Sequence, residues 1–473
     1  MDNKYKRLAK NTFWTLIGNT GSKLLGFLLL PLYTRWLGTA GFGESDLVIT
    51  YSSFLVCIMT MCVADGIFVF TKNQGQGVKK IYFSSSLLFI GIMLLFWAVV
   101  WVSLEIVFDV LEVKNSFANN LWLIFGMVVS TFIQQFSQQF VLSLEKIKIY
   151  SFTGILYSLL TLLFSYWLIP QIGVRGYILA VIYANLLTGS YSFLFSKSYQ
   201  YLSFRKFEKG KIYELLKYSI PLIPNGVMWW LVSALNRPVM EYNLDYSAIG
   251  IFAVANRFPG IITMVFTVFS VAWNISVFEE YGKDGYEDFY KKIFRMLFLS
   301  IIIVASIIIF SSELMISIFA APEFHEAWKY MIVMIVTSFI SCLSSFFGTN
   351  FGVVKQSKYF FYSSIWGAAT AIVFNIILIP FFGIWGATFS GLLSFVVMMS
   401  SRYIYSLKFV STPLLYYVLI YVLTLGIIAA IVLFIGNIYL KFLLSILLLS
   451  VLLYKERDIL KPIVNTFSQR ICK

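Results

Sequence analysis

The chain has 473 residues, of which 59% are hydrophobic and only 12% are charged, and its net charge is +14 at pH 7. Soluble domains carry roughly 25% charged residues, and a soluble protein this apolar would expose large patches and aggregate. Composition therefore excludes a soluble protein and predicts a membrane protein, in which an excess of Lys and Arg belongs to cytoplasmic loops rather than to a nucleic-acid interface.

The apolar segments predict an all-α polytopic membrane protein. A helix that spans a bilayer needs about twenty predominantly apolar residues. We expect no cleavable signal peptide, because the first apolar run is too long for one and lacks a small-residue cleavage site. In chain order, the sequence predicts about fourteen spans, at residues 12–34, 46–70, 81–104, 119–143, 150–170, 175–196, 214–235, 247–277, 294–319, 328–351, 359–381, 384–407, 412–435 and 438–454.

The basic residues predict how these spans are oriented. With the N-terminus placed inside, most Lys and Arg residues fall in alternating loops on the cytoplasmic side, and we count Arg402 among them. Lys23 and Arg257 remain at membrane depth. This pattern predicts an even number of spans with both termini in the cytoplasm. The basic residues that fall outside are Arg35, Lys114, Arg175, Arg237, Lys329 and Lys441.

Two motifs recur in the two halves of the chain. A shift of 207 positions places Pro31, Leu37 and Gly43 on Pro238, Leu244 and Gly250. The pattern L-I-P-x-x-G-x-x-G occurs at 168–176 and again at 378–386. Repetition at a nearly constant offset indicates an internal structural repeat. An even number of spans in each copy keeps both copies in one orientation, as in transporters with parallel repeats.

The repeat predicts four regions. Residues 1–197 form an N-terminal six-helix bundle, and residues 198–211 form a basic cytoplasmic linker. Residues 212–409 form a second six-helix bundle, related to the first by pseudo-symmetry. Residues 410–473 add two transmembrane helices and a cytoplasmic tail.

No residue pattern indicates catalysis. The sequence lacks a Gly-rich phosphate loop with its Lys and Ser/Thr, and it contains a single histidine, His325. Cys57 and Cys62 lie five positions apart on one predicted helix, where they could not easily form a disulfide. We therefore expect no enzyme activity, no cofactor and no metal site.

Cations at membrane depth are the candidate binding residues. A charged residue at the centre of a bilayer costs at least about 2.5–3.5 kcal/mol, so it needs a partner or a water-filled cavity. If the two halves face each other across such a cavity, Lys23 and Arg257 could hold a phosphate or pyrophosphate. Alternatively, each cation neutralises a buried acid. Asn19 and Asn256 neighbour these cations and could extend the polar wall of the cavity.

Several other charged residues near or within the predicted spans could have more than one role. Arg35 and Arg237, at the outer ends of spans one and seven, could bind substrate or anchor the helices at the interface. Asp65 lies deep in span two and could balance the charge of Lys23, bind a coupling cation or cap a broken helix. Acidic residues favour helix N-termini, so we expect Glu44 and Asp46 to stabilise the start of span two.

The opening of the chain resembles a known family. KNT at 10–12, LLLPLYTRWLG at 28–38 and GFGESD at 41–46 resemble the start of Wzx-type oligosaccharide flippases. These form the polysaccharide transporter branch of the multidrug/oligosaccharidyl-lipid/polysaccharide flippase superfamily. The resemblance implies a MATE/flippase-like fold with two six-helix bundles and two additional helices. It also implies a cationic central cavity, whose residues correspond by position to Lys23, Arg237 and Arg257.

The function implied by this resemblance is transport in a bacterial inner membrane. Members of the family move undecaprenyl-pyrophosphate-linked oligosaccharides to the outer leaflet by alternating access, for the synthesis of O-antigen, capsule or exopolysaccharide. Implied partners are this lipid-linked substrate, membrane lipids, a polysaccharide polymerase and a chain-length regulator. An ion-coupled drug antiporter of the same superfamily is the alternative, but it would need an acid-lined site and only Asp65 is deeply placed. A membrane-embedded glycan polymerase or ligase would need a longer outer loop than any predicted here.

Overall fold

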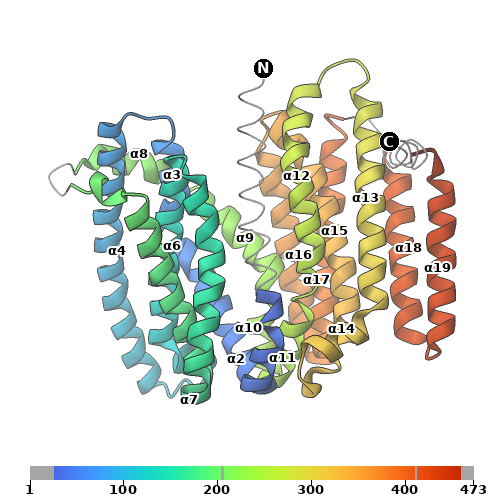
Figure 1. Ribbon diagram of the computed structural model, residues 1–473, viewed down its shortest axis with the longest axis horizontal. Coiled ribbons are helices and arrows are strands. Elements are labelled where there is room, and N and C mark those ends of the chain that lie inside the picture. Colours follow the sequence, from blue (N-terminus) through green and yellow to red (C-terminus); the bar gives the residue numbers. More distant parts are fainter. Residues whose placement is uncertain (1–25, 204–206, 411–412, 460–473) are drawn as a thin grey trace, which may run out of the picture. The chain divides into compact units, whose positions relative to one another are not determined.

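The computed structural model describes residues 26–203, 207–410 and 413–459, and all of their regular secondary structure is helical (Figure 1). Within these ranges, nine helices are long and apolar enough to cross a membrane, or ten when one bent pair is counted as a span. The all-α, multi-span prediction is confirmed. The count of fourteen is not confirmed; the difference lies in where helices join and break.

The contacts between Cα atoms divide the chain into two compact units. The first unit ends at Gly250, and the second begins at Ile251. The first unit contains α2 (Leu30–Met59), α3 (Val63–Thr71), α4 (Gln76–Val110), α5 (Ser116–Asn119), α6 (Leu121–Ser143), α7 (Ile147–Phe195), α8 (Lys209–Ser219), α9 (Leu222–Ala234) and α10 (Asn236–Asn243). Helix α11 (Tyr246–Ala255) crosses the boundary. The second unit contains α12 (Gly260–Glu280), α13 (Tyr286–Phe310), α14 (Ser312–Phe319), α15 (Ala327–Val353), α16 (Lys358–Phe382), α17 (Ile384–Ser406), α18 (Leu415–Phe434) and α19 (Ile438–Lys455).

Helices that follow the basic linker pack in the first unit. Helix α8 contacts α3 and α4 and lies across their ends, while α9 and α10 contact α2 (Figure 1). The boundary between the two compact units therefore lies about forty residues after the 198–211 segment. The two six-helix bundles at 1–197 and 212–409 stay a prediction.

Two predicted interruptions are tight turns at which α2 and α7 each divide into two helical segments. Helix α2 runs through residues 35–45, with one non-helical residue at Gly38 (φ 64°, ψ −177°). Helix α7 includes both predicted spans 150–170 and 175–196, with a break at Ile172 and Gly173. Glycine adopts a positive φ without steric cost, so a very short turn suffices at each place. In α7 the two segments then pack side by side, with the hydroxyl oxygens of Thr153 and Ser192 2.9 Å apart.

The predicted span 46–70 is broken instead. Helix α2 ends at Met59, and α3 begins at Val63. The expectation that Cys57 and Cys62 lie on one helix is therefore wrong. The residues of the break bring the two Sγ atoms to 2.7 Å.

The second repeated motif has the same local structure in both copies. Gly173 has φ 58° and ψ −130°, and its counterpart Gly383 has φ 56° and ψ −127°. Three residues later, a Cβ on Gly176 would lie 2.4 Å from the carbonyl oxygen of Leu168. In the second copy, a Cβ on Gly386 would lie 2.2 Å from the carbonyl oxygen of Leu378. Both copies thus need glycine for backbone conformation and for close approach.

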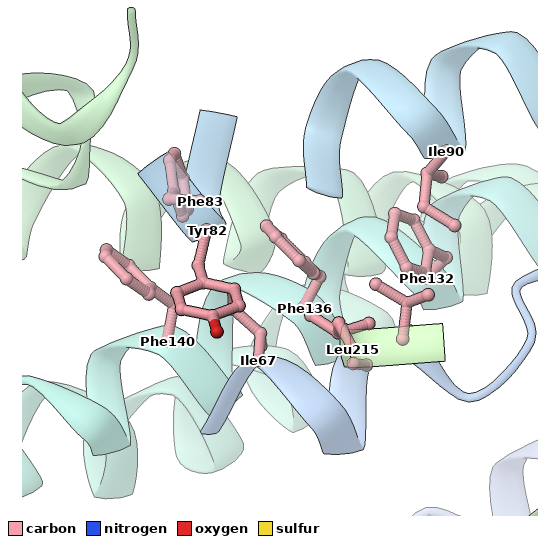
Figure 2. Close-up of a cluster of buried hydrophobic side chains, with 10 residues drawn as sticks. Ile67, Tyr82, Phe83, Ile90, Phe132, Phe136, Phe140 and Leu215 are labelled. Carbon is pink, nitrogen blue, oxygen red and sulfur yellow. The ribbon is translucent and has the colours of Figure 1, made fainter. Parts of the chain in front are cut away.

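An aromatic cluster forms part of the core of the first unit (Figure 2). Phe83 of α4 packs against Phe136 and Phe140 of α6, with ring centroids 5.5 and 4.2 Å apart. Ile67 of α3 and Leu215 of α8 belong to the same cluster. The cluster holds α8 against the bundle through apolar contact, which fixes the beginning of the segment that continues into α9 and α10.

An ion-pair network holds the last helices to the second unit. Figure 1 shows α18 and α19 beside α13. Arg295 of α13 donates through Nε to Glu456 (2.7 Å), just beyond α19, and through Nη1 and Nη2 to Asp458 (3.0 and 2.9 Å). The Glu456 side chain is 2% exposed, whereas that of Asp458 is 61% exposed. Hydrogen bonds from Arg295 lower the pKa of the Asp458 carboxyl.

Replacing Glu456 with glutamine should loosen this attachment. The change leaves the Arg295 guanidinium with a weaker, neutral acceptor in a buried place, which should cost about 1–3 kcal/mol. We expect a lower melting temperature of the purified protein and faster proteolysis between α17 and α19. Asp458→Asn is the matched control, because an exposed ion pair contributes about 0–1 kcal/mol. Equal effects of the two variants would contradict the assignment.

Candidate functional site

A buried ion pair joins α2 to α10. The Arg237 Nε donates a hydrogen bond of 2.6 Å to Asp46 Oδ2, and the two side chains are 8% and 11% exposed. The Arg237 Nη1 also donates to Asn236 Oδ1 and to the carbonyl oxygen of Ser233, both at 3.2 Å. The guanidinium is thus held by a carboxylate and two neutral acceptors. A charged group can be buried at tolerable cost when it has an ionic partner and further hydrogen bonds, as this guanidinium has.

Two glutamates extend this network to α5 and α6. Glu241 accepts hydrogen bonds from the Tyr51 hydroxyl and from the backbone N–H of Ser116, the latter at 2.6 Å. Glu44 accepts a hydrogen bond of 2.7 Å from Asn120 Nδ2. We call the set the polar junction; it consists of Glu44, Asp46, Tyr51, Asn120, Arg237 and Glu241.

The polar junction corrects the role expected for Glu44 and Asp46. The segment of α2 that follows the break at Gly38 begins at about residue 39, so both acids lie beyond its first turn, where the effect of a helix N-terminus has fallen off. Their carboxylates instead bind partners on other helices. The junction holds three carboxylates and one guanidinium, so it is an acidic group within the first unit. Among the residues that the structure describes, no cluster of three or more potential ligands could hold a metal ion.

The first repeated motif brings related residues into contact beside this junction. A Cβ on Gly43 would lie 2.0 Å from the carbonyl oxygen of Tyr246, and a Cβ on Gly250 would lie 2.0 Å from the carbonyl oxygen of Thr39. Thr39 and Tyr246 are themselves separated by the repeat offset of 207. The contact is therefore two-fold symmetric. Both glycines are required because the backbones of α2 and α11 touch there.

The predicted site residues fall in several places. Arg237 is buried in the ion pair described above, whereas Arg35 is exposed on α2 and Asp65 is exposed in the first turn of α3. Asn256 and Arg257 are exposed in the break between α11 and α12, which bend by 40°. Lys23 and Asn19 lie outside the described residues.

Sequence reasoning missed a second buried arginine. Arg402 of α17 is 5% exposed and donates to Ser363 Oγ (3.1 Å) and to the carbonyl oxygen of Ser344 (3.4 Å). Its guanidinium also lies 5.5 Å from the centroid of the Phe360 ring. It lies within α17 (Ile384–Ser406) rather than in a loop. Its place within the predicted span 384–407 was the signal that could have revealed this.

The sequence matches two known family models. The model of the family described as "Polysaccharide biosynthesis protein" matches residues 8–274, more than half of the chain, and the MatE model matches residues 223–377. No curated protein matches.

Three solved structures show the same fold. The lipid II flippase MurJ in an inward closed conformation is 14% identical, with a TM-score of 0.69, over 94% of this chain and 99% of that one. An inward-facing multidrug resistance MATE transporter of the MOP superfamily is 14% identical, with a TM-score of 0.61, over 80% and 94%. A point mutant of the Vibrio cholerae MATE transporter VcmN is 14% identical, with a TM-score of 0.56, over 87% and 98%.

These likenesses agree with the helical architecture. The chain therefore shares its fold with flippases and multidrug transporters. The chain belongs to the polysaccharide biosynthesis protein family of the multidrug/oligosaccharidyl-lipid/polysaccharide superfamily.

Proposed function

We propose that the protein is a flippase for undecaprenyl-pyrophosphate-linked oligosaccharide. It moves this substrate from the inner to the outer leaflet of a bacterial cytoplasmic membrane by alternating access, with both termini in the cytoplasm. The product supplies the synthesis of a surface polysaccharide, together with a polymerase and a chain-length regulator. The observation that carries this proposal is the family match over residues 8–274, whose description is polysaccharide biosynthesis.

Coverage of the solved structures supports a lipid-linked substrate. The likeness to the lipid II flippase includes 94% of this chain, against 80% and 87% for the two multidrug transporters. Lipid II is itself the substrate named for that relative. A longer shared fold with a lipid flippase favours a large amphipathic substrate over a small drug.

The break between α11 and α12 supports Arg257 as a substrate-binding residue. Irregular backbone at membrane depth is tolerated where it is buried in protein or lines a water-filled cavity. Arg257 is exposed at such a break, and its guanidinium offers a planar set of donors that suits pyrophosphate. Asn256, Arg35, Lys23 and Asn19 complete the proposed polar wall. Asp65 balances its charge or binds a coupling cation.

Replacing Arg257 tests the proposal. In cells that lack their own copy, Arg257→Ala should lower surface polysaccharide by roughly 10–150-fold at unchanged protein level, the effect of losing about 1.5–3 kcal/mol of charged hydrogen bonding. Arg257→Lys should retain part of the export, because it keeps the charge but not the planar fork. Lys329→Ala, at an exposed pair with Glu326, is the matched control. Normal export in Arg257→Ala would reject the assignment.

A multidrug antiporter is the second candidate. The MatE match over residues 223–377 and the three carboxylates of the polar junction favour it, because an antiporter for cationic compounds needs acidic residues. Its expression should then confer resistance to cationic dyes, and Glu241→Gln should abolish that resistance. Export of polysaccharide without dye resistance would favour the flippase.

A further inference from the structure

The break between α2 and α3 has an unusual backbone. Met61 and Cys62 have positive φ values of 51° and 52°. The left-handed conformation costs a residue other than glycine roughly 1–2 kcal/mol, and here two such residues are consecutive. The N–H of Cys62 donates to the carbonyl oxygen of Cys57 (3.3 Å), which closes a tight six-residue turn.

This turn brings two thiols together. On an uninterrupted helix with 3.6 residues per turn, side chains five positions apart point about 140° away from each other. Here the Cys57 and Cys62 Sγ atoms are 2.7 Å apart. A disulfide bond is about 2.0 Å long, so little movement separates the pair from bonding distance. The strained backbone of the turn thus holds a conformation that pairs two sulfur atoms.

The surroundings leave one thiol more accessible than the other. Cys57 is half-buried and Cys62 is buried. Helix α9 approaches the pair at Gly226, where a Cβ would lie 3.0 Å from Cys57 Sγ. The third described cysteine, Cys342, is buried in the second unit. Cys57 is therefore the thiol placed to react first, with Cys62 placed to resolve the product.

We propose that Cys57 and Cys62 form a redox-active dithiol that closes into an intramolecular disulfide. The oxidant is a small-molecule disulfide. The Cys57 thiolate attacks one sulfur of the oxidant and releases one thiol, which leaves a mixed disulfide on Cys57. The Cys62 thiolate then attacks Cys57 Sγ and releases the second thiol. The chain loses two protons and two electrons, and the oxidant gains them as two thiols.

Closing this bond would fix the turn between α2 and α3. The same helix α2 carries Glu44 and Asp46 of the polar junction and the contact at Gly43. A disulfide at its end limits how α2 and α3 can bend relative to each other. Oxidation should therefore slow transport reversibly, which makes the pair a modification site within the first unit.

The test uses the full-length chain with Cys57 and Cys62 as its only cysteines, through Cys342→Ser and Cys472→Ser. Purified protein is treated with 4,4′-dithiodipyridine under native conditions, and the cysteine-containing peptide is analysed by mass spectrometry. We expect the peptide to lose two hydrogen atoms and to carry no pyridyl adduct, and dithiothreitol should restore its mass. Phenylarsine oxide, which binds paired thiols, should protect both cysteines from the reagent.

Single variants provide the control. Cys62→Ser should retain a stable mixed disulfide on Cys57, because no second thiol resolves it. Two adducts on the two-cysteine chain, or no reaction until the protein is denatured, would overturn the proposal. Because the readout is the mass of a peptide, it does not depend on transport and remains informative if the proposed substrate is wrong.

Discussion

Replacing Arg237 with methionine should destabilise the protein by about 3–5 kcal/mol, the cost of leaving a buried charge without its partner. The change removes the only guanidinium of the polar junction and leaves the Asp46 carboxylate, whose side chain is 11% exposed, facing the space it occupied. We expect a large fall in melting temperature and in the yield of folded protein. Thermal unfolding in a fixed detergent measures this directly.

A second substitution separates the ion pair from other effects of the change. Asp46→Leu combined with Arg237→Met removes both charges, and well-packed apolar replacements of a buried pair are often neutral or stabilising. The double variant should therefore be more stable than either single variant. Lys283→Met is the matched control, because its pair with Glu280 is 58% and 42% exposed and should contribute about 0–1 kcal/mol. Strictly additive effects of the two changes at Asp46 and Arg237 would contradict the pairing.

The helical architecture could be predicted because the bilayer restricts length and polarity strongly. Spans such as 119–143, 328–351 and 384–407 correspond closely to α6, α15 and α17. The form of the turns between spans was harder to predict than their positions. Glycine marks a possible change of direction, but whether the helix bends at Gly38 or ends in a loop depends on tertiary packing, which local sequence does not contain.

The site was predicted less well, for a physical reason. Asp46 and Arg237 are 191 positions apart, so no local pattern connects them, and each looked like an independent charge near the end of a span. A charge at membrane depth indicates that a partner or a cavity exists, but it does not identify which. The repeat offset did contain long-range information, since it relates Gly43 to Gly250, which the structure shows in contact.

Adding a single methyl group at this glycine contact should have the second large effect. In Gly43→Ala, the new carbon would lie 2.0 Å from the carbonyl oxygen of Tyr246 and 2.7 Å from the backbone nitrogen of Gly250. Neither neighbour is a flexible side chain, so α2 and α11 must move apart. Overpacking typically costs about 1–3 kcal/mol and occasionally more, and we expect about 3 kcal/mol here together with loss of export.

The symmetry of the contact makes the prediction sharper. Gly250→Ala should have an effect of similar size, because its carbon would lie 2.0 Å from the carbonyl oxygen of Thr39. One alanine already separates the two helices, so the second alanine disrupts fewer remaining contacts. The loss in free energy of unfolding of the double variant should therefore be smaller than the sum of the losses of the two single variants. Gly91→Ala in α4 is the matched control, since its Cβ would meet nothing within 4 Å and alanine favours a helix by about 1 kcal/mol. If Gly43→Ala unfolds and exports like Gly91→Ala, the backbones of α2 and α11 do not touch at this point.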